Sequence, residues 1–133
     1  QKLQHLLRDL NALLKNEPAL HEKDFDPSGF EWIDFMDSDN STISFLRKTD
    51  DPKDTLVFVC NFTPVYRESY RIGVPFHCQY REILNTDSEI YWGSNKGNLG
   101  GIHSDEMGWH NQSFSLDIKV PPLATIIFKP ILE

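Results

Sequence analysis

The chain has 133 residues, of which 39% are hydrophobic and 12% aromatic, which is enough for one compact core and too few for two of ordinary size. Its formal net charge is −7, so it lacks the excess of cations that neutralises phosphates, and we expect no nucleic-acid partner. No apolar stretch approaches the roughly 18 to 20 residues that span a bilayer, so we expect no membrane partner either.

The N-terminal segment predicts one amphipathic helix over residues 2–15. Its leucines recur at spacings of three and four, which places them on a single stripe. Asn16 fits the turn that ends the helix, and Pro18 cannot continue it. Because a bare leucine stripe is unfavourable in water, we expect it to dock on the rest of the chain, pair with another copy or fray.

The rest of the chain predicts a connector and then strands. Residues 17–39 are rich in Pro, Gly, Asp and aromatics without a period of 2 or 3.6, which indicates an irregular connector with buried aromatic rings. Beyond it the expected strands are 42–47, 55–62, 66–72, 80–85, 113–120 and 124–130. The predicted fold is therefore mainly β: an antiparallel β-sandwich preceded by one amphipathic helix and an irregular connector.

Two of these strands carry a more specific pattern. In residues 55–62, apolar side chains occupy both alternating faces, so this strand should be central and covered on both sides. In residues 113–120, apolar and polar side chains alternate, which is typical of a strand with one wet face. Between residues 91 and 111 the chain is rich in Gly and Asn and leaves little room for regular structure.

The chain has two cysteines, Cys60 and Cys78. A core of this size does not need a disulfide, so both are expected to be buried thiols in a reducing compartment, which favours a cytoplasmic location.

Three loops imitate ion sites. Asp37, Asp39 and Ser41 resemble the start of a calcium loop, but the sixth position is Thr42 and the twelfth is Lys48, so a turn is expected instead. Residues 93–101 lack the Gly-Lys-Ser/Thr ending of a phosphate loop.

A third cluster is a candidate zinc site and consists of His103, Asp105, Glu106 and His110. Their spacing is not that of a helical histidine pair, and hydrogen bonds that shape the loop are the favoured explanation. Nothing in the sequence picks out two carboxylates that would face one glycosidic bond, and no local nucleophile signature is present. The sequence predicts no metal, no cofactor and no catalytic residue.

Three large aromatic residues, Tyr91, Trp92 and Trp109, lie in the polar, glycine-rich segment. Aromatic faces on loops can stack on the apolar faces of sugar rings, and neutral sugars need no counter-charge. The alternative is that the rings seal the loop onto the sandwich. Both explanations are open, with sealing favoured, and the three residues are the predicted candidates for glucan contact.

A collinear series of motifs resembles the C-terminal region of bacterial 1,4-alpha-glucan (glycogen) branching enzymes of the alpha-amylase superfamily. The motifs are DFDPSGFEWID at 24–34, SFLR at 44–47, NFTPV at 61–65, YRIGV at 70–74, REILNTD at 81–87, GSN at 93–95, HSDE at 103–106 and PPLAT at 121–125. The resemblance implies a sandwich of the alpha-amylase C-terminal all-β type. It also implies that residues 1–39 are the tail of a catalytic TIM barrel and residues 40–133 the β-domain.

In that family, barrel carboxylates cut an alpha-1,4-glucan and transfer the piece to a 6-hydroxyl, which makes a branch in glycogen. No residue of this chain matches those carboxylates, so the resemblance implies a non-catalytic domain that packs on the barrel, stabilises it and aids glucan binding. The alternative is an independent carbohydrate-binding module for alpha-glucan. A metal hydrolase using His103 and His110 is a more remote alternative.

Overall fold

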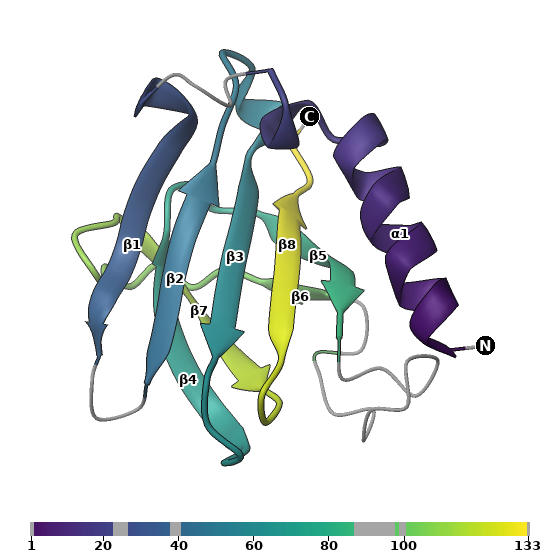
Figure 1. Ribbon diagram of the computed structural model, residues 1–133. Coiled ribbons are helices and arrows are strands. Elements are labelled where there is room, and N and C mark those ends of the chain that lie inside the picture. The colour runs from purple at the N-terminus through teal and green to yellow at the C-terminus, as the bar shows by residue number, and fades with distance from the viewer. Residues whose placement is uncertain (1, 23–26, 38–40, 87–97, 99–100, 133) are drawn as a thin grey trace.

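The computed structural model describes residues 2–22, 27–37, 41–86, 98 and 101–132, and Figure 1 shows their arrangement. The chain begins with helix α1, Lys2–Asn16, followed by three 3-10 turns, η1 Pro18–Leu20, η2 Pro27–Gly29 and η3 Pro52–Asp54. The strands are β1 Phe30–Asp37, β2 Thr42–Arg47, β3 Leu56–Asn61, β4 Arg67–Val74, β5 Gln79–Asn85, β6 Gly101–His103, β7 Phe114–Val120 and β8 Thr125–Pro130.

The strands form two antiparallel sheets that pack face to face, as predicted. One has the order β1-β2-β3-β8-β5-β6 and the other pairs β4 with β7. All six predicted strands are present within two residues of their expected bounds. The core between the sheets consists of alternate residues of the facing strands, with Val57, Ile72, Leu116 and Phe128 among its fully buried members.

Two strands were missed, and each has a physical reason. β1 lies in the second half of the expected connector, where register shifts between Trp32 and Asp34 and between Asp34 and Asp37 break the alternation that reveals a strand. The prediction of irregular structure was therefore wrong for residues 30–37, as was the expected burial of Phe30 and Trp32, which are exposed. β6 has only three residues, too few to show a period.

The helix is confirmed and docks on the outer face of the six-stranded sheet (Figure 1). Its Leu6 and Leu13 pack with η1 against a second apolar cluster, whose buried residues are Ala19, Leu56, Leu84 and Ile127. Strand β3 is thus covered on both sides, as expected. The other side of the stripe, Leu7, Leu10 and Leu14, is 53%, 39% and 52% exposed, and we call these three residues the leucine face.

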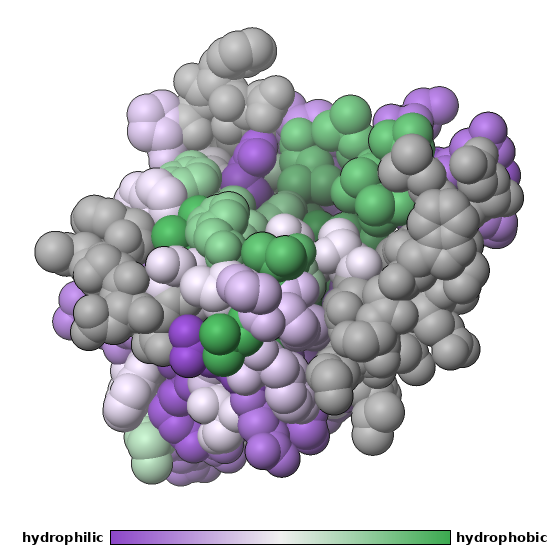
Figure 2. Space-filling view, turned by 60° about the horizontal axis from the view of Figure 1, so that its bottom comes forward, coloured by the Kyte–Doolittle hydropathy of each residue, from purple (hydrophilic) through white to green (hydrophobic). Residues whose placement is uncertain are grey.

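The lower end of the sandwich also exposes apolar side chains. Phe62 and Val65 follow β3, and Leu123 precedes β8. Figure 2 looks onto this end and shows hydrophobic atoms gathered between the grey segments. Leu123 has a φ of 51° and is 68% exposed, although a positive φ is strained for a bulky residue.

Both cysteines are free thiols, as predicted. They are half-buried, whereas the sequence predicted buried thiols. Burial raises the pKa of the Cys60 thiol and of the Cys78 thiol. None of the described helices is long and apolar enough to span a membrane.

Candidate functional site

Trp109 opens a tight turn between β6 and β7. Its N–H donates to the carbonyl of Gln112 over 3.1 Å, and the Gln112 N–H donates back over 2.9 Å. The two residues between them, His110 and Asn111, have φ values of 49° and 62°, the pattern of a type I′ turn. Trp109 itself is 45% exposed. We call residues 109–112 the Trp109 turn.

The Trp109 turn rests directly on strand β4. A Cβ at Gly73 would lie 2.0 Å from the Trp109 carbonyl oxygen, so only glycine permits this approach. The Gly73 N–H donates to Nδ1 of His110 over 3.2 Å. The ring proton therefore sits on Nε2, which is 3.3 Å from the Asp34 carboxylate. These contacts hold His110 in its left-handed conformation.

A third contact ties the turn to strand β1. The Gln112 side-chain amide donates to Glu31 over 2.9 Å, and the Lys48 ammonium lies 2.8 Å from the other oxygen of that carboxylate. Hydrogen bonds from Lys48 and Gln112 hold the pKa of Glu31 below its ordinary value. The turn is thus fixed to both sheets, because β4 and β1 belong to different ones.

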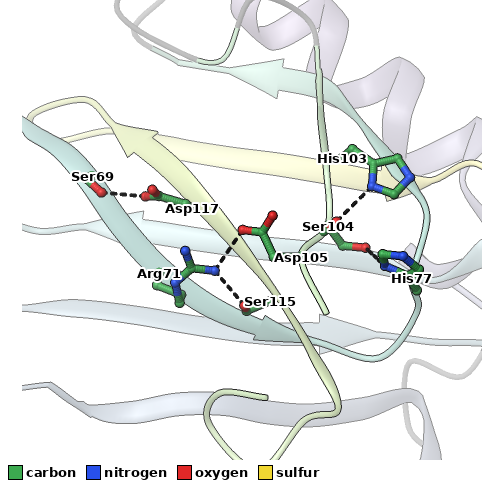
Figure 3. Close-up of polar contacts among 8 residues, drawn as sticks. All are labelled: Ser69, Arg71, His77, His103, Ser104, Asp105, Ser115 and Asp117. Atoms are coloured by element: carbon green, nitrogen blue, oxygen red, sulfur yellow. Dashed lines mark hydrogen bonds and ion pairs between the residues drawn. The ribbon is translucent and has the colours of Figure 1, made fainter. Parts of the chain in front are cut away.

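The segment that leads to the turn covers the outer face of the two-stranded sheet with polar contacts (Figure 3). The Arg71 guanidinium donates to the Asp105 carboxylate over 2.9 Å and to the Ser115 hydroxyl over 2.7 Å. Asp105 also exchanges backbone hydrogen bonds with Ser115, and the Arg71 side chain lies on the Ser115 hydroxyl, so Ser115 is fully buried on the face predicted to be wet. Further along, Ser69 donates to Asp117 over 2.6 Å.

A second polar group surrounds Ser104, which is buried. Its hydroxyl lies 3.0 Å from Nδ1 of His77 and accepts the Cys78 N–H over 2.9 Å (Figure 3). The His103 ring donates to the Ser104 carbonyl over 2.8 Å, and Nε2 of His77 is 3.2 Å from Glu106. These bonds join the start of β5 to the end of β6. The Ser104 hydroxyl is engaged in them, so we interpret this group as structural rather than as a nucleophile.

The candidate zinc residues do not converge. His103 bonds to Ser104, Asp105 to Arg71, Glu106 to His77 and His110 to Asp34. Within the described ranges, no group of three or more His, Cys, Asp or Glu side chains could hold a metal. Sequence reasoning missed Gly73, Arg71 and His77, whose roles depend on contacts across 26 or more positions of the chain.

Several predicted positions lie outside the described residues: Tyr91, Trp92, Asp39 and all of residues 93–101 except 98 and 101. Asn98 is buried and donates to Glu82 and to the Lys119 carbonyl, while its own side-chain oxygen accepts the Lys119 N–H. The Asn98 side chain therefore links β5 to β7.

Four rings form a row across the outer face of β1, β2 and β3: Phe30, Trp32, Phe45 and Phe58. Phe45 stacks between Phe30 and Phe58, with ring centroids 5.1 and 4.8 Å apart and interplanar angles of 23° and 9°. Trp32 meets Phe30 edge to face at 5.0 Å. Stacking covers both faces of Phe45 and one face each of Phe30 and Phe58. This aromatic row suits packing by protein better than stacking by a sugar.

Comparison with known proteins agrees with the geometry. A model of the family described as "Alpha amylase, C-terminal all-beta domain" matches residues 32–131. Three similar relatives carry the name 1,4-alpha-glucan branching enzyme GlgB: those of Aquifex aeolicus, Paramagnetospirillum magneticum and Cereibacter sphaeroides. They are 53%, 56% and 52% identical over 96%, 93% and 96% of this chain. The chain spans only 20%, 17% and 17% of their lengths.

Proposed function

The chain belongs to the alpha-amylase C-terminal all-beta domain family, and on this premise we propose that it is the non-catalytic C-terminal domain of a glycogen branching enzyme. The relatives named as branching enzymes support the parent activity, which transfers alpha-1,4-glucan segments to form alpha-1,6 branches. In enzymes of this kind the reacting carboxylates lie on a TIM barrel, and the polar groups described above are all committed to holding loops. We place the parent in the cytoplasm.

The observation that carries this proposal is the leucine face. Leu7, Leu10 and Leu14 point away from the sandwich while Leu6 and Leu13 of the same helix pack on it. Burying a leucine fully is worth about 1.5–3 kcal/mol, so three half-exposed leucines leave several kcal/mol of stabilisation unused. The partner that we propose is the catalytic barrel, with the helix and the turns before β1 as its tail; β1 pairs with β2 and so goes with the β-domain rather than with the tail.

The aromatic row supports the same partner. It lies on the outer face of the six-stranded sheet, the face on which α1 docks, and Phe30 and Trp32 remain exposed there. The aromatic row and the leucine face each expose several apolar side chains, and exposed apolar patches of this kind mark interaction surfaces. We propose that the barrel covers the leucine face and that its neighbouring surface packs on the aromatic row.

The test uses a relative that lacks this region, such as the A. aeolicus enzyme without the stretch that matches this chain. Adding the 133-residue chain should raise the melting temperature of the truncated enzyme and increase its branching of amylose, measured by reducing ends after debranching. The chain alone should form no branches. Branch formation by the chain alone, or a truncated enzyme that is indifferent to it, would overturn the proposal.

A second function, alpha-glucan contact, is favoured by the Trp109 turn. The turn sets the backbone from which an exposed aromatic ring projects, which lowers the ordering that a sugar-stacking site requires on binding. Trp109 is the described member of the three predicted contact residues. We propose that it stacks on a glucose ring, either to extend the glucan surface of the parent or as part of an independent carbohydrate-binding module.

Trp32 provides a matched control for Trp109, since the two rings are 46% and 45% exposed. Trp109→Ala should weaken binding of maltoheptaose by about fivefold, and Trp32→Ala should leave it within about twofold. Binding is measured by calorimetry or by tryptophan fluorescence. Equal effects of both substitutions, or no binding at millimolar sugar, would contradict the proposed glucan contact. Neither result would bear on the proposed docking to the barrel.

A further inference from the structure

A cavity of about 300 Å³ lies at the upper end of the six-stranded sheet, where η3, β5 and the end of β8 meet. Three cationic side chains line it, Lys53, Arg81 and Lys129, and Asp54 is the acidic residue of the lining. The chain as a whole carries a net charge of −7, so this local excess of positive charge runs against the overall composition. The cavity attracts anions in an otherwise acidic protein.

The cations of the cavity differ in what neutralises them. The Lys129 ammonium is 2.6 Å from the Glu17 carboxylate, so its charge is balanced. Asp54 accepts a hydrogen bond from the Thr49 hydroxyl over 3.2 Å. In the part of the chain that the structure describes, the ion pairs and side-chain hydrogen bonds engage neither the Lys53 ammonium nor the Arg81 guanidinium. Lys53 and Arg81, set against the Asp54 carboxylate, leave an excess of one positive charge in the lining for a ligand.

The strand register adds an independent observation. Arg81 of β5 lies directly opposite Lys129 of β8 in the antiparallel ladder. Glu17 balances Lys129, so the register places the guanidinium of Arg81, which has no such carboxylate among the described residues, at the edge of the cavity. The planar guanidinium of Arg81 offers paired donors that match two oxygens of a phosphate.

We propose that this cavity binds a small phosphate-bearing anion, with Arg81 as its paired-donor contact and Lys53 as the second cation. A phosphate monoester carries about −1.5 to −2 charges at neutral pH, and its several oxygens can accept hydrogen bonds from the Arg81 guanidinium and the Lys53 ammonium at the same time. Pro130 and Ile131 form an apolar wall of the same cavity, and Ile131 is exposed. That wall can contact the organic part of a phosphate ester, so an ester binds more tightly than free phosphate.

The test does not depend on the proposed function and uses the 133-residue chain itself. Its ¹H–¹⁵N spectrum is titrated with inorganic phosphate and, separately, with glucose 6-phosphate, at ionic strength held constant with chloride. The expected result is saturable shifts at the amides of Lys53, Arg81 and Ile131, with a dissociation constant of about 1–5 mM, and tighter binding of the ester.

Three variants sharpen the test. Arg81→Gln should weaken binding about tenfold or more and Lys53→Gln about threefold. Lys119→Gln removes an exposed cation from β7, outside the cavity lining, and should leave binding unchanged. Absence of saturation up to about 50 mM, equal effects of Lys53→Gln and Lys119→Gln, or acetate binding as tightly as phosphate would each overturn the proposal.

Discussion

The two outer faces of the sandwich differ in the chemistry of the side chains that they present. Over the two-stranded sheet, the segment from Ser104 to Gln112 folds back and satisfies the strands with polar contacts, including the bonds of Arg71 to Asp105 and Ser115. Over the six-stranded sheet, only part of the face is covered by α1, while the aromatic row and the leucine face stay apolar and open. Among the described residues, the first face is satisfied by contacts within the chain, and the second leaves apolar side chains exposed.

This difference separates the two proposed roles. A polar, internally bonded surface with one exposed ring is suited to a soluble ligand such as a sugar, because the surface is stable without it. Exposed apolar side chains, by contrast, are stabilised when another protein covers them and removes them from water. The same domain can therefore face glucan on one side and the catalytic body on the other.

The largest expected effect comes from disturbing the Trp109 turn, which packs on the two-stranded sheet. Gly73→Ala would place a Cβ 2.0 Å from the Trp109 carbonyl, so the Trp109 turn must move, and we expect a loss of about 3 kcal/mol in the free energy of unfolding. Gly108→Ala is the control, because its Cβ would meet its nearest neighbour at 3.1 Å and should cost less than about 1 kcal/mol. Urea denaturation measures both, and similar losses would contradict the anchoring of the turn on β4.

The next effect compares the two sides of helix α1. Leu13→Ala removes a packed side chain and should lower the free energy of unfolding by about 2 kcal/mol. Leu14→Ala removes an exposed one and should change it by less than about 0.5 kcal/mol in the isolated chain. Equal losses in denaturant titrations would mean that the stripe is buried on both sides, and the leucine face would not be free for a partner.

A smaller effect concerns pH and the link between the turn and β1. The pKa of Glu31 is lowered in the folded chain from its ordinary 4.5, so its stabilising contribution is present above that value and is lost as the pH falls through the folded pKa. Glu31→Gln should therefore flatten the acid-side fall in stability by less than about 1 kcal/mol, the range of an exposed ion pair. Glu68→Gln, an exposed carboxylate on β4, is the control. Unfolding is measured at pH 7 and at pH 3.5, and an unchanged slope in Glu31→Gln would contradict the bond network.

The smallest effect tests the lower end of the sandwich. Leu123→Gly relieves a positive φ and removes an exposed side chain, which outweighs the added freedom of glycine in the unfolded chain. We expect a gain of about 0.5 kcal/mol in the free energy of unfolding, seen as a higher melting temperature. A clear loss would show that Leu123 packs on neighbours despite its exposure.

Local patterns predicted most of the fold. The alternation in residues 113–120 and the leucine spacing in residues 2–15 each depend on neighbours in the sequence, and both elements were confirmed. β1 could not be predicted because register shifts erase its period. The site was predictable only in part: Trp109 stood out by its polar surroundings, whereas its support by Gly73 and Asp34 arises from tertiary contacts that no local spacing reveals.

The central claim is that the open apolar side of this chain docks on a separate catalytic body. The most direct measurement is the affinity of the 133-residue chain for the truncated A. aeolicus enzyme, by calorimetry, with and without Leu7, Leu10 and Leu14 changed together to Ser. We expect micromolar or tighter binding, lost by at least about a hundredfold in the triple variant and retained in the polar control Asn11→Ser. Undetectable binding of the unaltered chain, or equal binding by the triple variant, would contradict the account.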